Sequence, residues 1–268
     1  MKNKNQFRAM FTGFAAVAIP VLFVVALLLY IYVLGNPANF QGGNINNNPL
    51  PGNYLATVYK GGVIVPILMT ILLIVITFTI ERFITITKAK GKGRVNSFVA
   101  KVHMDLSNKN IDNAMNECDK QKGSVASVIK AGLLKYKEMI PVKELNRDQK
   151  VIAIKQEIEE ATSLELPMLE QNLVIIATIA SIATLMGLLG TVLGMIKAFG
   201  ALATSGAPDA VALASGISEA LINTALGIST SALAIIFYNY FTTKIDKLTY
   251  SIDEAGVAIV QNFAANYN

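Results

Sequence analysis

Four long stretches of the chain are almost entirely apolar, and the polar residues gather between them. A helix needs about 20 predominantly apolar residues to cross the hydrocarbon core of a membrane, and each stretch reaches that length. We therefore predict an all-α fold, a polytopic helical membrane protein with four transmembrane helices. The predicted spans are Phe11–Leu34, Val63–Ile86, Leu173–Ala203 and Val211–Phe241.

A long polar region lies between the second and third spans. Its apolar residues recur at intervals of three and four, which predicts helices. A longer helix follows, with Asn146 as its N-cap and Gln149 as the capping-box partner. We expect Pro167 to kink this helix where it meets the third span, because proline removes a backbone donor. The predicted short helices are Val95–Leu106, Ile111–Lys120 and Val125–Met139.

Two connections between spans have turn-forming compositions. Gly35–Tyr54 is rich in Asn, Gly and Pro, which favour turns and cannot build a core, so we expect an extended loop. Ala203–Ala210 predicts a tight turn that makes the third and fourth spans an antiparallel hairpin, with Asp209 as the N-cap of the last helix.

Composition and charge support a membrane protein and give it a topology. The chain is 53% hydrophobic and 15% charged, with a formal net charge of +5. The cations gather between the second and third spans, whereas the segments 35–60 and 204–210 together hold one, Lys60. By the positive-inside rule the central region and both termini are cytoplasmic, and those two loops face outward. This distribution argues against a nucleic-acid partner and for a lipid bilayer.

The topology divides the chain into six segments. They are an N-terminal cytoplasmic tip with an extra transmembrane helix (1–34), a periplasmic loop (35–62), a transmembrane helix (63–86), a helical cytoplasmic domain (87–170), a transmembrane hairpin (171–241) and a cytoplasmic C-terminal tail (242–268). The first apolar run also invites interpretation as a secretory signal peptide. It is longer than the ~7–15 residues of a signal core, so we expect a retained anchor.

No catalytic, metal or cofactor site is visible in the sequence. Cys118 is the single cysteine and His103 the single histidine, so neither a disulfide nor a metal-ligand cluster is indicated. The glycines around Gly190 lack the Lys-Ser/Thr pair of a nucleotide-binding loop, and hydrolase motifs are absent from the sequence. We therefore expect no enzyme activity and no cofactor.

The third and fourth spans each carry a stripe of small and hydroxylated residues at helical spacing. Small residues let helices approach closely in lipid, so packing alone explains much of this pattern. The packing glycines on the two spans are Gly187, Gly190, Gly194, Gly216 and Gly227. The stripes also contain Ser181, Thr184, Thr191 and Ala198 on the third span, and Glu219, Asn223 and Thr230 on the fourth, with Ala220, Thr224, Ser231 and Ala234 close beside them.

Glu219 is not explained by packing. It lies about eight residues into the fourth span, which places it about 12 Å below the outward end, within the hydrocarbon zone. Ionisable groups at such depth commonly mark ion or proton pathways, although a protonated structural glutamate is the alternative. Lys197, near the outward end of the third span, is expected to anchor the helix at the interface. Glu81 and Arg82 are expected to form an interfacial ion pair or to serve as helix-end charges.

Two segments resemble the MotA/TolQ/ExbB proton channel family. "GLLGTVLGMIKAF" (Gly187–Phe199) is similar to the family signature Gly-Leu-x-Gly-Thr-Val-x-Gly-Ile, and "ASGISEALINTALGISTSALAIIFYN" (Ala214–Asn239) is similar to the pattern of the next helix. A glutamate at the position of Glu219 is typical of the ExbB and TolQ branch. Ser215 replaces the usual proline, and the additional N-terminal span departs from the common ExbB layout.

The resemblance implies a pore-ring subunit of an inner-membrane, proton-driven motor. It implies a homo-oligomeric ring of about five copies around a small, single-span ExbD-like partner with a transmembrane aspartate, working with a TonB-like protein to energise transport across the outer membrane. It also implies that Thr191 and Thr224 line the pore and that Glu219 is the pore carboxylate. A TolQ-like envelope-integrity motor and a non-conducting structural ring remain the alternatives.

Overall fold

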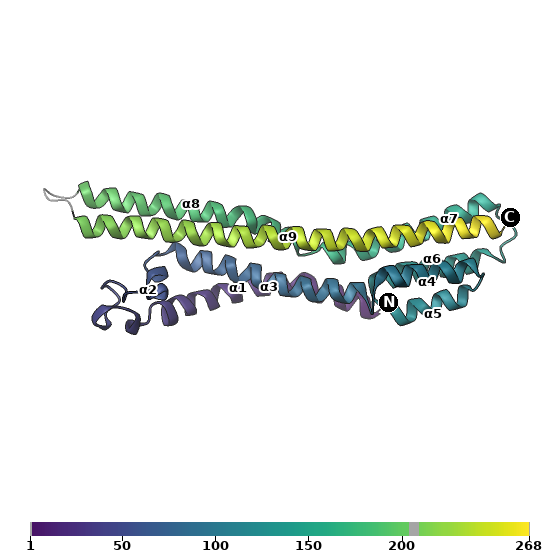
Figure 1. Cartoon of the computed structure of the whole chain (residues 1–268), viewed down its shortest axis with the longest axis horizontal. Coiled ribbons are helices and arrows are strands. Elements are labelled where there is room, and N and C mark those ends of the chain that lie inside the picture. Colours follow the sequence, from purple (N-terminus) through teal and green to yellow (C-terminus); the bar gives the residue numbers. More distant parts are fainter. Residues whose placement is uncertain (1, 204–208, 268) are drawn as a thin grey trace. The chain divides into compact units, whose positions relative to one another are not determined.

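The structure is a computed structural model that describes residues 2–203 and 209–267 (Figure 1). Within those residues the elements are helices, apart from an isolated bridge between Phe40 and Pro49. The chain forms two compact units. The membrane unit comprises Met1–Ile80 with Val174–Tyr238, and the helical domain comprises Glu81–Leu173 with Asn239–Asn268.

In the part of the chain that the structure describes, four helices are long and apolar enough to cross a membrane, which confirms the predicted all-α, four-span fold. The first span is α1 (Lys2–Leu28), which ends in a π-helical turn, η1 (Leu29–Leu34). The others are carried by α3 (Ile64–Lys90), α8 (Leu173–Ala203) and α9 (Ala210–Asn266). Both α3 and α9 begin in the membrane unit and end in the helical domain.

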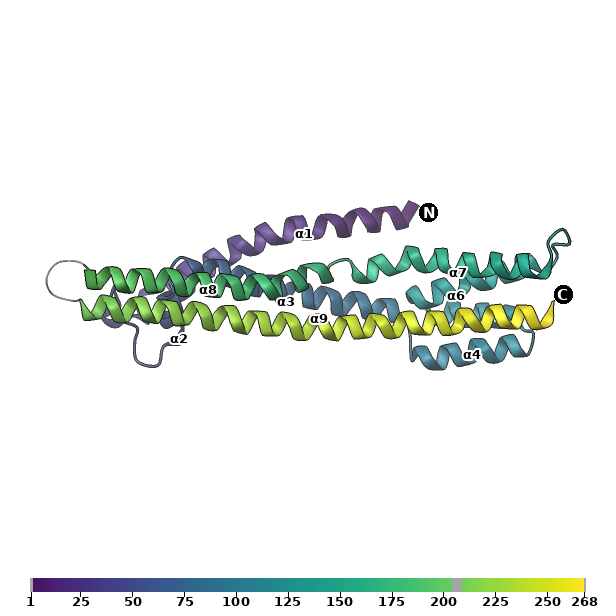
Figure 2. The same ribbon diagram turned by 90° about the horizontal axis from the view of Figure 1, so that it is seen from above.

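In the membrane unit, α8 and the first half of α9 run side by side as an antiparallel hairpin (Figure 2). Asp209 caps α9 as predicted, because its Oδ1 accepts from the backbone N–H groups of Val211 and Ala212, both at 3.0 Å. Most of the turn predicted at Ala203–Ala210 lies outside the described residues, since the description resumes at Asp209.

The first span keeps most of its apolar surface exposed within the chain. Along the apolar part of this helix, Phe14–Leu34, Ala26 and Leu34 are the buried residues, whereas the span carried by α3 buries a much larger share of its residues. Phe14 packs edge-to-face on Phe78 of α3, with ring centroids 5.7 Å apart. A helix that is apolar all round and largely uncovered is suited to a lipid environment.

The segment between the first two spans is folded, so the expectation of an extended loop was wrong. We call residues 35–62 the cap. It contains two short 3-10 helices, η2 (Pro37–Asn39) and η3 (Gln41–Gly43), and the helix α2 (Tyr54–Tyr59). The few apolar residues of the cap are enough to bury a small cluster: Phe40 and Ala56 are 2% and 0% exposed, and Tyr59 packs edge-to-face on Phe40.

Lys60 links separate parts of the cap through its ammonium group. Its Nζ donates to the carbonyl oxygens of Ile45 at 2.9 Å and Asn46 at 3.2 Å, and it stands 5.5 Å from the centre of the Phe40 ring. Burial lowers the pKa of Lys60, and the positive charge of Lys197 lowers it further. The cation therefore satisfies two backbone carbonyl groups of the cap and packs over its buried ring.

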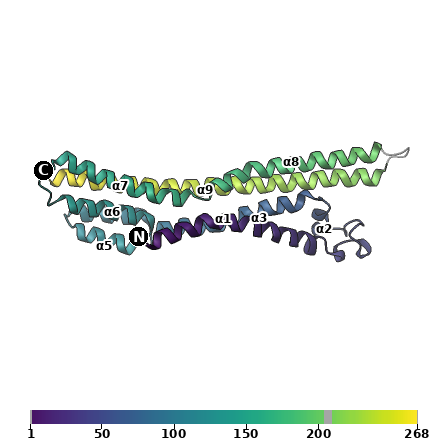
Figure 3. The same ribbon diagram turned by 180° about the vertical axis from the view of Figure 1, so that it is seen from behind.

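The helical domain contains four helices close to the predicted ones. They are α4 (Val95–Ser107), α5 (Ile111–Gln121), α6 (Gly123–Met139) and α7 (Arg147–Glu170). Each helix packs against the next one in the chain, α4 on α5, α5 on α6 and α6 on α7. Figure 3 shows α6 lying between α5 and α7. The predicted capping box is present, since the Asn146 side chain accepts from the Gln149 N–H and the Gln149 side chain accepts from the Asn146 N–H.

The C-terminal tail is helical, which the sequence analysis did not predict. The helix α9 continues without a break to Asn266. In the helical domain it buries one stripe of apolar residues at intervals of three and four, a pattern that would have revealed the helix. The stripe consists of Phe241, Ile245, Leu248, Ile252, Ala255, Ile259 and Phe263.

The break between α7 and α8 lies at Gln171–Asn172, beyond Pro167. The helix α7 passes through the proline and ends at Glu170. Its last carbonyl oxygens have no partner within the helix, and Arg82 supplies donors to two of them: Nη1 lies 3.0 Å from the oxygen of Leu169 and 3.3 Å from that of Met168. The helix therefore ends beyond the proline, and the cation of Arg82 stabilises that end.

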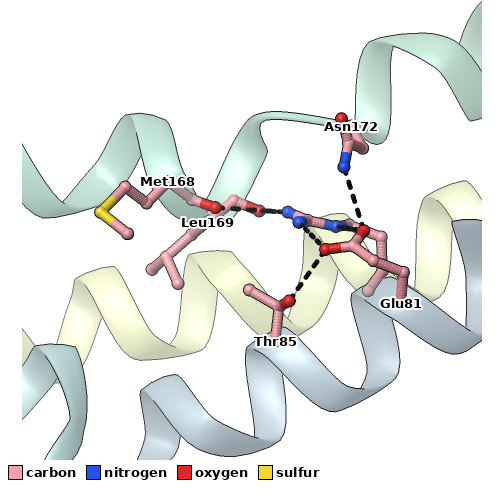
Figure 4. A network of polar contacts seen from close by, with 6 residues as sticks. Glu81, Thr85, Met168, Leu169 and Asn172 are labelled. Carbon is pink, nitrogen blue, oxygen red and sulfur yellow. Dashed lines mark hydrogen bonds and ion pairs between the residues drawn. The ribbon is translucent and has the colours of Figure 1, made fainter. Parts of the chain in front are cut away.

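Arg82 and Glu81 form a buried polar network at this helix end (Figure 4). The guanidinium contacts both carboxylate oxygens of Glu81, at 2.5 and 2.6 Å, and Arg82 is 0% exposed. Glu81 also accepts from Thr85 at 2.9 Å and from Asn172 at 3.1 Å. The ion pair expected from the sequence is present. It also links the end of the second span to the residues just before the third, a contact that could not be predicted from two adjacent charged residues.

We predict that Arg82→Met destabilises the protein by about 3–5 kcal/mol, because the substitution leaves the largely enclosed Glu81 carboxylate without its cation. Thermal unfolding of the detergent-purified protein, followed by size-exclusion chromatography, measures the effect. Lys155→Met is the control on α7, since the pair of Lys155 with Glu159 is exposed, at 67% and 65%. Equal melting temperatures for the two variants would contradict the prediction.

A second prediction concerns the thiol of Cys118, which is 3% exposed in the helical domain. Burial raises its pKa to about 12, and the charge of Asp119 adds to the effect. We expect labelling by a maleimide at pH 8 to be at least about a hundredfold slower in the folded protein than in denaturant, because the thiolate reacts. A cysteine introduced by Met104→Cys, at a position 61% exposed, should react at once in the folded protein. Fast labelling of native Cys118 would show that the domain core is not closed.

Candidate functional site

The hydroxyls of Thr191 and Thr224 meet between α8 and α9. Their oxygen atoms are in direct hydrogen-bonding contact, and either can be the donor. Thr191 also lies 3.2 Å from the carbonyl oxygen of Gly187, and Thr224 lies 3.1 Å from that of Ala220. Both residues are half-buried. The structure therefore brings together two residues that the sequence separates by 33 positions.

The predicted packing glycines lie where the two helix backbones come closest. A Cβ on Gly187 would lie 3.0 Å from the Cα of Gly227, and one on Gly227 would lie 2.6 Å from the carbonyl oxygen of Ala183. Nearer the hairpin turn, a Cβ on Gly194 would lie 2.8 Å from the oxygen of Gly216. Any side chain at these positions would push the backbones apart.

Gly190 has a different role, since it makes room for a side chain. A Cβ there would clash with the Cβ of Asn223 on α9. Asn223 is 1% exposed, and its Nδ2 donates to the carbonyl oxygen of Gly61 in the cap at 2.8 Å. The glycine therefore lets a buried amide pass between α8 and α9 and reach the cap.

Glu219 pairs with Lys197 across the hairpin. The Nζ of Lys197 lies 2.7 Å from Oε2 of Glu219, and the two side chains are 62% and 15% exposed. From the sequence we expected Lys197 to anchor the helix at the interface, and its contact with Glu219 was not predicted. The position of Lys197 six residues after Thr191 did not reveal the contact, because it depends on how far α8 and α9 slide past each other.

Glu219 also lies close to the cap and to the start of the second span. The carboxylate lies against Gly62, and the second span, α3, begins two residues later at Ile64. Glu219 is therefore level with the start of the second span, because the α8–α9 hairpin extends beyond it. Next to the polar cap, an ionised Glu219–Lys197 pair loses less hydration than it would at mid-membrane.

These contacts form a polar seam along the hairpin, which we define by Lys197, Glu219, Thr191, Thr224 and Ser231. Ser231 continues it on α9, where its Oγ donates to the carbonyl oxygen of Ala180 at 2.5 Å. The seam offers a carboxylate, an amine and hydroxyls, groups that exchange protons or hydrogen bonds. No group of three His, Cys, Asp or Glu residues in the described part of the chain is arranged to hold a metal ion.

The fold and the seam define a class, a multi-pass helical membrane protein whose last two spans form a polar, glycine-packed hairpin. The model of the MotA/TolQ/ExbB proton channel family matches residues 120–254, half of the chain. The chain belongs to the MotA/TolQ/ExbB proton channel family.

Individual relatives carry both ExbB and TolQ names. The chain is 37% identical over 86 residues to "Putative biopolymer transport protein ExbB-like 3" of Synechocystis, covering 31% of this chain and 41% of the relative. It is 32% identical over 124 residues to "Tol-Pal system protein TolQ" of Pseudomonas aeruginosa, covering 46% and 54%. It is 42% identical over 81 residues to "Biopolymer transport protein ExbB" of Helicobacter pylori, covering 30% and 56%. The chain spans about half the length of these relatives.

We predict that Gly227→Ala lowers the stability of the hairpin by about 1–3 kcal/mol, because the added methyl meets backbone atoms that cannot move aside. Gly200→Ala is the matched control, since a Cβ there meets nothing within 4 Å. Alanine favours a helix over glycine by about 1 kcal/mol, so the control should be neutral or stabilising. Melting curves of the two purified variants decide the matter, and an equally stable Gly227→Ala would show that the backbones do not touch there.

Proposed function

We propose that the chain is the pore-ring subunit of a proton-driven motor of the inner membrane, one that energises TonB-dependent transport across the outer membrane. The observation that carries this proposal is the paired hydroxyls of Thr191 and Thr224 in the hairpin, with the Glu219 carboxylate nearby. In this proposal the hydroxyls border the hydrated proton path, and Glu219 is the ring carboxylate that tunes it.

We propose a ring of about five copies, and uncovered apolar surface on the hairpin supports association with further copies. One face of α8 exposes large apolar side chains at intervals of three and four, and α9 exposes others. Surfaces of this kind pack against a second copy or against lipid. The residues on α8 are Leu185, Leu188, Val192, Ile196 and Phe199, and those on α9 include Ile217, Leu221 and Ile228.

A separate partner is part of the proposal, because the four predicted spans contain no aspartate. We propose a small, single-span ExbD-like protein whose transmembrane aspartate carries the proton inside the ring, with a TonB-like protein receiving the motion. Both termini of the present chain are then cytoplasmic, as the positions of the cations favour.

The second candidate is a TolQ-like motor for envelope integrity, and the similarity to the TolQ protein of Pseudomonas aeruginosa favours it. The identity of the co-purifying partner separates the two. A TonB-like protein supports import, and a Tol-type protein supports the alternative. A non-conducting ring, in which the seam serves packing alone, is tested by proton flux.

The test is proton flux into liposomes that contain the chain and its single-span partner. We predict that Glu219→Ala, Thr191→Val and Thr224→Val each lower the flux at least about tenfold, because the new side chains neither donate nor accept a proton. Thr178→Val is the control, since this exposed threonine of α8 bonds to its own helix, at the carbonyl oxygen of Val174. Unchanged flux in the three seam variants would refute the site assignment, whereas absent flux in the wild type would favour the non-conducting ring.

A further inference from the structure

The cap is attached to α9 one helical turn from Glu219. The Nδ2 of Asn223 donates to the carbonyl oxygen of Gly61 at 2.8 Å, and this hydrogen bond is buried. Because residues four positions apart share a helix face, Asn223 and Glu219 both point toward the cap. The amide thus fixes the cap beside the carboxylate.

Gly62 lets the cap backbone lie directly against the carboxylate. Its φ angle is +76°, a conformation that side chains disfavour, and a Cβ there would clash with Oε1 of Glu219. The atom in the way is the end of a flexible side chain, so a methyl group at Gly62 would move the carboxylate and leave the α9 backbone in place.

The cap and α8 enclose Glu219 from two sides. The backbone of Gly62 lies against Oε1 of Glu219, and the Nζ of Lys197 donates to Oε2 at 2.7 Å. Lys60, in the cap, lies near Lys197, and the positive charge of Lys197 lowers the pKa of Lys60. The side chain of Glu219 is therefore largely enclosed, with 15% of its surface exposed.

The additional first span holds the cap from the other end. The hydroxyl of Tyr30, in η1, donates to the carbonyl oxygen of Tyr59 at 3.2 Å, and the two rings stack with centroids 4.7 Å apart. At the end of the same span, a Cβ on Gly35 would lie 2.7 Å from the Tyr59 ring. The first span, the cap and α9 therefore form one connected path to the carboxylate.

We infer that the cap, held by the first span, is a positioning element for the pore carboxylate: Gly62 and Asn223 keep Glu219 directed at Lys197. This inference rests on the proposed function for the role of Glu219 in proton flux, but the geometry it asserts can be measured without flux. It gives the additional N-terminal span a purpose, namely the placement of one side chain on another helix.

The test compares Gly62→Ala with Gly52→Ala in the full chain. Gly52 is the matched control, since it lies in the same cap at a φ of +79° and a Cβ there meets nothing within 4 Å. Both variants carry the same backbone strain, so a difference between them reports the contact with Glu219. Size-exclusion chromatography and melting curves verify that both variants assemble.

The first readout is the infrared carboxylate band of Glu219, isolated by subtracting the spectrum of Glu219→Gln. We expect the band to shift in Gly62→Ala, because the displaced carboxylate loses its contact with Lys197, and to stay in place in Gly52→Ala. The variant Asn223→Ala, which detaches the cap from α9, should shift the band as well and decides the question if Gly62→Ala does not assemble.

The second readout is proton flux with the single-span partner. Misplacement of a reacting group by about 1 Å can cost up to a hundredfold, so we expect Gly62→Ala to lose about tenfold or more and Gly52→Ala to keep the wild-type flux. Adding Gly62→Ala to Glu219→Gln should cause no further loss. A band and a flux in Gly62→Ala equal to those of Gly52→Ala would overturn the inference. Absent flux in the wild type, with a shifted band in Gly62→Ala, would refute the proposed function and leave the positioning intact.

Discussion

Backbone contact between α8 and α9 is the constraint on which the candidate site depends. Hydrophobic burial drives little association between helices in lipid, so close approach of small residues has to supply the contact. Gly187 against Gly227 and Gly194 against Gly216 bring the two backbones together. The seam residues reach one another because of this approach, so the same glycines that stabilise the hairpin also determine which polar groups meet.

Three polar side chains that are buried or largely enclosed bond to distant parts of their own unit. In the helical domain, Arg82 serves the carbonyl oxygens at the end of α7, and Asn172 serves the carboxylate of Glu81. In the membrane unit, Asn223 serves the cap. Such groups are costly to leave unpaired, so they specify which segments come together as well as stabilising them.

The sequence predicted the parts of the fold that follow from local pattern. Apolar length revealed the four spans, helical spacing revealed α4, α5 and α6, and local cap chemistry revealed Asn146 and Asp209. It did not reveal the folded cap, because one buried phenylalanine and one lysine hold it against its polar composition. The family motif identified Thr191, Thr224 and Glu219, but the Lys197 and Gly62 contacts depend on the offset between helices.

The hydroxyl pair of Thr191 and Thr224 has no built-in direction. If Thr191 donates to Thr224, the proton of Thr224 is free to bond to the carbonyl oxygen of Ala220. If Thr224 donates instead, the proton of Thr191 bonds to that of Gly187. Both arrangements contain the same number of hydrogen bonds, so reversing the pair costs no bond. The proton path that we propose would have to reset its polarity after each transfer, and this pair can do so without moving a helix.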